Sequence, residues 1–212
     1  MYTSYFFDFD YTLANSERGI IDCVRHTLKK LDYKDVSDDL IRRTIGMPLK
    51  EAAVIATGES DKEKVELFFS TFLEFSDTYM TVGTEFYPDT LDVLRELKRR
   101  GKNIAKVSSK RSQRIAEKFA LEKASDLVDL IIGNNEVENL KPAPDGLLIA
   151  MKEFGIDKSD VLYTGDSIID AEAAKRGSID FAAVTTGVTP SEAFAPYPHV
   201  KIMRNLSELL TL

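Results

Sequence analysis

From about residue 84 to the C-terminus, short apolar runs alternate with helical patterns, and this alternation restricts the fold more than any other feature. Strands that alternate with helices favour a parallel sheet covered by helices on both faces. We expect strands at 104–107, 128–132, 161–164, 181–184 and 200–203, and helices at 88–100, 112–119, 144–154, 168–176 and the C-terminus.

The beginning of the chain belongs to the same sheet, because residues 4–9 form a strongly apolar, aromatic run that predicts a buried strand. Strand patterns are then absent from 15 to 84. Helical spacing takes their place at 20–31, with Ser16 as its N-cap, and at about 38–45, 48–56 and 62–79. We therefore expect an α/β core of residues 1–14 and 84–212 that carries an all-helical insert of residues 15–83.

Polar side chains suited to chemistry follow four of the predicted strands. They are Asp8 and Asp10, then Ser108 and Ser109, then Lys141, and finally Asp166 and Asp170. As a pair alone, Asp8 and Asp10 are as typical of a turn as of a site. Taken alone, Asp166 and Asp170 suit helix caps, Ser108 suits a turn and Lys141 suits an exposed loop. Because parallel strands end at one edge of the sheet, we expect all of them to converge there. Carboxylates suit Mg²⁺, while a lysine and hydroxyls suit phosphate oxygens, so the set favours phosphoryl transfer.

Four segments, in their order along the chain, resemble the four motifs of the haloacid dehalogenase-like superfamily. They are Asp-Phe-Asp-Tyr-Thr-Leu at 8–13, Val-Ser-Ser-Lys at 107–110, Lys-Pro-Ala-Pro-Asp at 141–145 and Gly-Asp-Ser-Ile-Ile-Asp at 165–170. The helical insert after the first motif, with Ile-Gly-Met-Pro-Leu at 45–49, is similar to the phosphoglycolate phosphatase-like branch. The resemblance implies a Rossmann-like, three-layer parallel-sheet core with an α-helical cap.

The resemblance also implies a role for each motif residue. Asp8 is implied to be the nucleophile and a metal ligand, and Asp10 the general acid and base, whose backbone carbonyl reaches the metal. Ser108, with Ser109 beside it, is implied to bind phosphate, and Lys141 to support Asp8 and phosphate. Asp166 is implied to bind Mg²⁺, and Asp170 to lie in or just behind the metal shell. Thr12 is expected to brace the loop. One departure is Tyr11, where the family most often has Gly, and a bulky side chain there could narrow substrate choice.

The function implied is a Mg²⁺-dependent phosphatase that acts through an aspartyl-phosphate, with phosphoglycolate as the best-fitting substrate; pyrophosphate, nucleotides and sugar phosphates stay open. A sugar phosphomutase resembling β-phosphoglucomutase would use the same residues. A non-catalytic phosphate-binding protein of this fold would have lost motif residues, and none is lost. Arg43 and Lys50 are candidates to bind a second anion of the substrate, although a solvated helix end explains them equally well.

Composition narrows the partners. The net charge is −7, from 28 basic and 35 acidic residues, which disfavours non-specific binding to nucleic acid. Cys23 is the only cysteine, so no internal disulfide can form and a reducing compartment is natural. No apolar run has the length of a membrane span, and no signal-peptide pattern is present. We expect a cytoplasmic monomer or homodimer that acts on a small phosphorylated metabolite.

Overall fold

The computed structural model describes residues 2–212, with every side chain in that range except that of Thr78. The chain divides into two compact units. The first, called the sheet unit, contains the residues up to Ala14 together with Phe86–Leu212. The second, called the helical unit, is Asn15–Glu85. The chain passes between the units at β2 (Ala14–Asn15) and β3 (Glu85–Phe86), which form a two-stranded sheet.

The sheet unit is built on a six-stranded parallel sheet with the order β5-β4-β1-β6-β7-β8. The strands are β1 (Ser4–Phe7), β4 (Asn103–Val107), β5 (Leu130–Ile132), β6 (Val161–Gly165), β7 (Asp180–Val184) and β8 (Lys201–Met203). β1 lies in the middle, with Phe7 level with Lys106 on one neighbour and Thr164 on the other. This central position explains why all four residues of β1 are buried.

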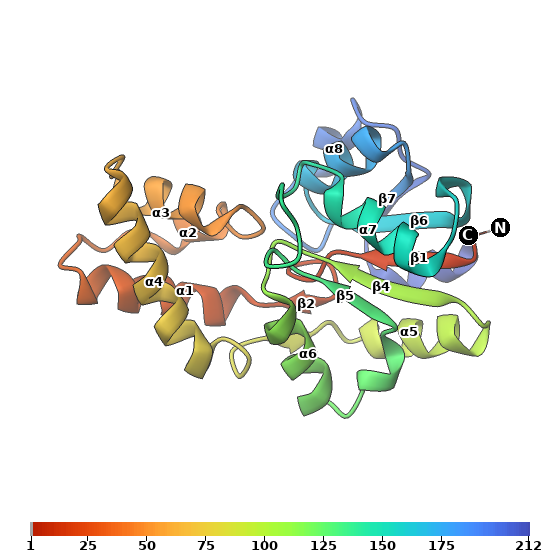
Figure 1. The fold of residues 1–212 in the computed structure, drawn as a ribbon, viewed down its shortest axis with the longest axis horizontal. Coiled ribbons are helices and arrows are strands. Elements are labelled where there is room, and N and C mark those ends of the chain that lie inside the picture. The colour runs from red at the N-terminus through yellow and green to blue at the C-terminus, as the bar shows by residue number, and fades with distance from the viewer. Residues whose placement is uncertain (1) are drawn as a thin grey trace. The chain divides into compact units, whose positions relative to one another are not determined.

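Helices cover both faces of this sheet (Figure 1). One face packs against α5 (Thr90–Arg99), α6 (Ser112–Leu121) and the 3₁₀ helix η4 (Leu206–Thr211). The other packs against α7 (Asp145–Phe154), α8 (Ile168–Gly177) and the 3₁₀ helix η3 (Ser191–Phe194). Two further 3₁₀ turns are η1 (Ser125–Leu127) and η2 (Lys158–Asp160). The predicted Rossmann-like α/β architecture is confirmed.

The helical unit has its own apolar core. Its helices are α1 (Glu17–Lys30), α2 (Asp38–Arg42), α3 (Leu49–Thr57) and α4 (Lys62–Tyr79). Buried side chains of α1, such as Leu28, belong to the same apolar cluster as Phe68 and Phe72 of α4. Near the start of α1 the backbone at Gly19 lies so close to Gly83 that a Cβ on Gly83 would come within 2.6 Å of the Gly19 Cα. A side chain at either position would therefore push these segments apart.

Some elements end earlier than their sequence patterns predict. The strand expected at 4–9 stops at Phe7, because the Phe9 carbonyl accepts hydrogen bonds from the backbone of Leu13 and Ala14 and so closes a tight turn. The helix expected at 38–45 ends at Arg42, and the C-terminal helix is the 3₁₀ helix η4. Among residues 2–212, no helix has the length and apolar character to cross a membrane.

Candidate active site

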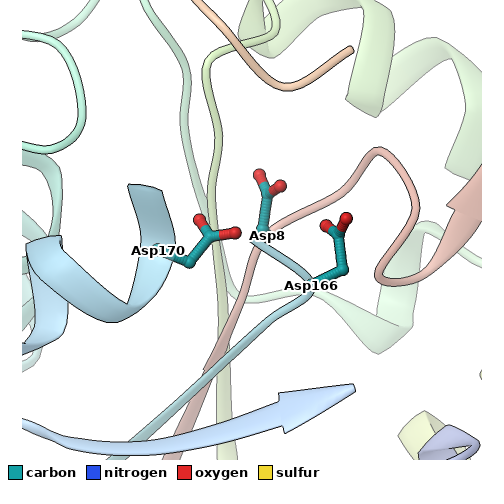
Figure 2. Close-up of side chains that lie close together, drawn as sticks. All are labelled: Asp8, Asp166 and Asp170. Atoms are coloured by element: carbon teal, nitrogen blue, oxygen red, sulfur yellow. The ribbon is translucent and has the colours of Figure 1, made fainter. Parts of the chain in front are cut away.

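Three buried carboxylates meet at the carboxyl edge of the sheet. Asp8 follows β1, Asp166 follows β6, and Asp170 lies in the first turn of α8. A carboxylate oxygen from each lies within 4.8 Å of the other two. Figure 2 shows the three side chains side by side, with Asp8 between Asp170 and Asp166. The convergence expected from a parallel sheet thus places acids from distant parts of the chain in one site.

Lys141 supplies the positive charge of this cluster. Its side chain is buried, and its ammonium lies 2.9 Å from Asp8 Oδ1 and 2.6 Å from Asp170 Oδ1. Burial by itself would lower the pKa of Lys141, but the carboxylates of Asp170 and Asp8 raise it above its ordinary value. The lysine therefore stays charged between two acids that would otherwise repel each other.

Burial raises the pKa of the acids, whereas it lowers that of a lysine. Loss of water contact raises the pKa of Asp8 to about 6, against the attraction of Lys141 and with further repulsion from Asp170 and Asp10. Burial and the neighbouring Asp170 and Asp8 also raise the pKa of Asp166 well above its usual range. One ammonium thus does not balance the negative charge of this edge, and a cation bound there would relieve the excess.

Asp170 differs from the other two acids because its oxygens are already occupied. Its Oδ1 accepts hydrogen bonds from Lys141 Nζ at 2.6 Å and from the Tyr163 hydroxyl at 2.7 Å. Its Oδ2 accepts from the backbone N–H of Ser167 at 3.2 Å and from the Ser167 hydroxyl at 2.6 Å. The second pair belongs to a capping box that begins α8. Asp170 is thereby fixed as an anchor for Lys141.

The loop after β1 contacts the fourth motif segment through a side-chain hydrogen bond. The Thr12 hydroxyl donates to Asp166 Oδ1 at 3.1 Å, so Thr12 braces an acid as well as its own loop. Tyr11 is buried and has a left-handed backbone with φ of 59°. That conformation is the physical reason why glycine suits this position. Here the Tyr11 carbonyl accepts a hydrogen bond from the Thr186 hydroxyl, which holds the loop in place.

The serines follow β4, as the sequence indicates. Ser108 is buried, and its hydroxyl accepts a hydrogen bond from the backbone N–H of Lys110 at 3.3 Å. The Ser109 hydroxyl oxygen is buried and makes no hydrogen bond with the described part of the chain. Asp10 is also buried, and its Oδ1 lies 2.8 Å from the ammonium of Lys110. Asp8, Ser108 and Asp166 thus lie directly after a strand, whereas Lys141 lies in the longer segment between β5 and α7 and Asp170 in the first turn of α8.

Three site residues carried no assignment from sequence reasoning. Tyr163 reads as an ordinary strand residue, yet its hydroxyl contacts Asp170 and also accepts from Lys141 Nζ at 3.2 Å. Gly187 lies in a polar loop, yet a Cβ there would fall 2.0 Å from Asp166 Oδ2. Lys110 stood within the second motif segment without a role. Of the three, only Lys110 could have been found from the sequence, because a lysine directly after Ser108 and Ser109 adds positive charge beside two phosphate-binding candidates.

The two substrate-binding candidates of the insert lie in the helical unit. Arg43 is exposed at the end of α2. Lys50, in α3, has its ammonium 2.5 Å from Glu66 Oε2 and 5.0 Å from the centre of the Phe69 ring, and its side chain is 54% exposed. Both residues thus have surface surroundings within their own unit, and their role toward a substrate stays a prediction.

The residues of the sheet edge fit a hard divalent cation. All candidate ligand atoms are oxygens, with no sulfur or imidazole among the clustered residues of the described chain. Asp8 and Asp166 are the acids whose charge burial opposes most clearly, whereas Asp170 already accepts four hydrogen bonds. The donor set therefore favours Asp8 and Asp166 as direct ligands of Mg²⁺, with Asp170 behind them.

The chain is similar to known proteins over most of its length. The family model described as haloacid dehalogenase-like hydrolase matches residues 5–184. Phosphoglycolate phosphatase 1 of Pseudomonas aeruginosa is 30% identical over 211 residues, which cover 96% of this chain and 77% of that protein. Pyrophosphatase PpaX of Bacillus cereus is 25% identical over 206 residues, covering 97% and 94%. A crystal structure from Bacteroides fragilis, described as a haloacid dehalogenase-like hydrolase, has a TM-score of 0.95 at 40% identity and covers 99% and 100%.

Proposed function

The chain belongs to the haloacid dehalogenase-like hydrolases, and we propose that it is a Mg²⁺-dependent phosphatase that cleaves a small phosphate monoester with Asp8 as its nucleophile. The observation that carries this proposal is the Asp8 carboxylate, which is buried between Lys141 and the other acids at the carboxyl edge of the sheet. An anionic nucleophile can approach an anionic ester only where positive charge is concentrated around it.

The first chemical step joins Asp8 to phosphorus. A carboxylate oxygen of Asp8 forms the new O–P bond while the bond from phosphorus to the ester oxygen breaks. Asp10 gives its proton to that departing oxygen, which leaves as an alcohol. Lys141, 2.9 Å from Asp8 Oδ1, keeps the attacking group oriented and offsets charge on the transferring phosphoryl group.

The second step releases phosphate and restores Asp8. Asp10, now a carboxylate, takes a proton from water as the water oxygen attacks phosphorus and the bond to Asp8 breaks. Ser108 and Ser109, which follow β4, are the hydroxyls that we assign to the phosphate oxygens. The buried Ser109 oxygen makes no hydrogen bond in the described chain, and so a phosphate oxygen would supply the partner that this hydroxyl lacks.

We assign the metal to Asp8 and Asp166, with the backbone carbonyl of Asp10 as the third protein oxygen. A bound Mg²⁺ ion supplies positive charge that lets the nucleophile approach the phosphoryl group. Two residues then position Asp166: the Thr12 hydroxyl donates a hydrogen bond to it, and Gly187, which has no Cβ, leaves room for its carboxylate. Lys141 and Asp170 form the supporting pair on the other side of Asp8.

For the substrate we propose a small phosphorylated carboxylic acid of the phosphoglycolate type. The support is the similarity to proteins named phosphoglycolate phosphatase, which covers nearly the whole chain. Proteins named pyrophosphatase PpaX are similar over a comparable length, and so pyrophosphate is the second candidate. The residues around Asp8 serve both, since either substrate presents a terminal phosphoryl group to the same nucleophile.

Phosphate release from a panel of esters tests the function. Phosphoglycolate, pyrophosphate, a sugar phosphate and p-nitrophenyl phosphate are each assayed with Mg²⁺ and with excess EDTA. Asp8→Asn is expected to reduce turnover to background while the protein stays folded, and the exposed Asp126→Asn serves as the matched control. Turnover by Asp8→Asn near the wild-type rate would refute the nucleophile. Turnover in EDTA with no metal in the sample would refute the metal dependence.

A further inference from the structure

A second lysine lies at the edge of the sheet and contacts a different acid from Lys141. The ammonium of Lys110 is 2.8 Å from Asp10 Oδ1, and the two side chains are only 8% and 10% exposed. Lys141, by contrast, contacts Asp8, Asp170 and Tyr163. The two lysines therefore have different partners: Lys141 contacts the proposed nucleophile, whereas Lys110 contacts Asp10, the proposed acid and base.

The backbone holds Lys110 in place from behind. Its N–H donates to the Ser108 hydroxyl at 3.3 Å, and its carbonyl accepts from the backbone N–H of Asn134 at 3.1 Å. Gly133 makes this approach possible, because a Cβ there would lie 2.6 Å from the Lys110 carbonyl oxygen. The loop after β4 is thus tied to the loop after β5, and the lysine extends from a fixed point.

The side chain of Lys110 has further contacts that limit its freedom. Its ammonium lies 5.7 Å from the centre of the Phe9 ring, which is itself fully buried beside Asp10 in sequence. A buried ion pair of this kind costs desolvation on both sides and adds little to stability by itself. Its presence at the acid of the proposed reaction therefore suggests a role in that reaction.

We propose that Lys110 is a positioning residue that orients the Asp10 carboxyl group for proton transfer. This inference rests on the proposed phosphatase function and adds a residue to it. By binding Oδ1, the ammonium restricts rotation of the carboxyl group, so each carboxyl oxygen keeps one direction. Proton transfer requires the acid and the ester oxygen to be within hydrogen-bond reach and aligned, and a rotating carboxyl group would often miss that geometry.

The competing role for Lys110 is that of a phosphate-binding cation that contacts Asp10 only when no substrate is present. The two roles differ in which substrates depend on the lysine. A positioning residue for Asp10 matters most for esters whose leaving oxygen must be protonated, such as alkyl phosphates. A phosphate-binding cation matters equally for every ester, because all of them carry the same phosphoryl group.

The test compares Lys110→Met, Lys110→Arg and the exposed control Lys158→Met on two classes of ester. The measured quantity is kcat/KM, since it reports the step in which the leaving group departs. For Lys110→Met we expect a loss of about 10²-fold on alkyl phosphates such as phosphoglycolate, the low end of what acid–base help provides. The loss on p-nitrophenyl phosphate is expected to be much smaller, because nitrophenolate leaves without a proton.

Two further measurements sharpen the outcome. With p-nitrophenyl phosphate, Lys110→Met should show a larger burst of nitrophenolate, because the second step still needs Asp10 to take a proton from water. Inhibition by inorganic phosphate should be unchanged, and Lys110→Arg should recover most of the alkyl ester activity. A purely structural role would not change the dependence on the leaving group.

An equal loss on all esters, with weaker inhibition by phosphate, would overturn the proposal in favour of phosphate binding. Unaltered kinetics would overturn it as well, since the ion pair would then be a resting contact. Both outcomes leave the phosphatase standing if Asp8→Asn is inactive. An active Asp8→Asn enzyme would instead remove the proposed function, whatever Lys110 does.

Discussion

Two regions of the sheet unit each contain a buried lysine in opposite surroundings. At the carboxyl edge, Lys141 lies between the carboxylates of Asp8 and Asp170, at 2.9 and 2.6 Å. On the face covered by α5 and α6, the fully buried Lys106 of β4 has its ammonium 4.3 Å from the centre of the Phe7 ring and 5.5 Å from that of Phe119. Its nitrogen makes no hydrogen bond with any residue in the described range.

The difference shows that burial alone does not identify a functional charge. Burial lowers the pKa of Lys106 well below its ordinary value, and Asp129 only partly opposes this. The same burial acts on Lys141, but its carboxylate partners reverse the direction of the shift. Lys141 is therefore kept charged by its partners, whereas Lys106 is destabilised as a cation, with two ring faces beside it and no hydrogen bond to its nitrogen in the described chain.

The largest expected effect comes from breaking the carboxyl edge with Lys141→Met. This change leaves Asp8 and Asp170 buried without their cation. We expect turnover to fall by more than about 10²-fold, in line with the loss of an electrostatic group in a closed site. Removing one partner of a buried ion pair should also lower the free energy of unfolding by about 3–5 kcal/mol. Phosphate release and urea unfolding in metal-free buffer measure the two effects.

Lys158→Met, which removes an exposed charge, is the control for the Lys141 substitution. It should change neither activity nor stability beyond about 0.5 kcal/mol. If Lys141→Met behaved like this control, the paired surroundings of Lys141 would have no functional meaning, and the contrast with Lys106 would disappear.

The next effect has the opposite sign and concerns Lys106→Met. Methionine has a similar length and no charge to desolvate, so it suits the space between Phe7 and Phe119. We expect the free energy of unfolding to rise by about 1–3 kcal/mol, the usual cost of an uncompensated buried polar group. Activity should be unchanged, because Lys106 takes no part in the proposed reaction. Destabilisation would mean that the ring contacts favour the lysine after all.

Lys106 also predicts how stability depends on pH. Its folded pKa is depressed, whereas the unfolded chain has the ordinary lysine value of about 10.4. Between these two values the unfolded state binds more protons, so the wild-type free energy of unfolding should rise with pH in that window. Lys106→Met should lack this part of the slope. Identical slopes for the two proteins would show that Lys106 has no depressed pKa.

The sequence revealed one of these regions and concealed the other. Asp8, Lys141 and Asp166 could be predicted to meet, because each follows a strand and parallel strands end at one edge. Lys106 lies in the middle of a correctly predicted strand, but the sequence does not predict whether a lysine in an apolar run has an ion-pair or hydrogen-bond partner. That depends on which side chains α6 and β1 bring to it, and those come from distant positions.

The same limit explains the site residues that were missed. Tyr163 of β6 contacts Asp170 because its side chain lies on the face that α8 covers, a relation that appears only when strand and helix are packed together. Gly187 is needed because its backbone approaches Asp166, which lies 21 residues earlier in the chain. Motif spacing locates the charged groups, whereas the neutral groups that hold them are set by packing.

The smallest expected effects lie in the helical unit, where Lys50, unlike Lys106 and Lys141, is at the surface. Lys50 is half-exposed and already paired with Glu66, and exposed ion pairs contribute under about 1 kcal/mol. Lys50→Ala and Arg43→Ala should therefore leave stability almost unchanged. Any role they have must appear in kinetics.

If Arg43 binds the carboxylate of phosphoglycolate, Arg43→Ala should lower kcat/KM for this substrate by about 10-fold, or roughly 1.4 kcal/mol. The effect on p-nitrophenyl phosphate, which has no carboxylate, should be negligible, so that ester is the internal control. Lys50→Ala should do less, because its ammonium must first leave Glu66 to reach a substrate. Equal losses on the two esters would show that neither side chain recognises the leaving group. The charges of the helical unit would then be surface charges, and specificity would have to come from the sheet edge itself.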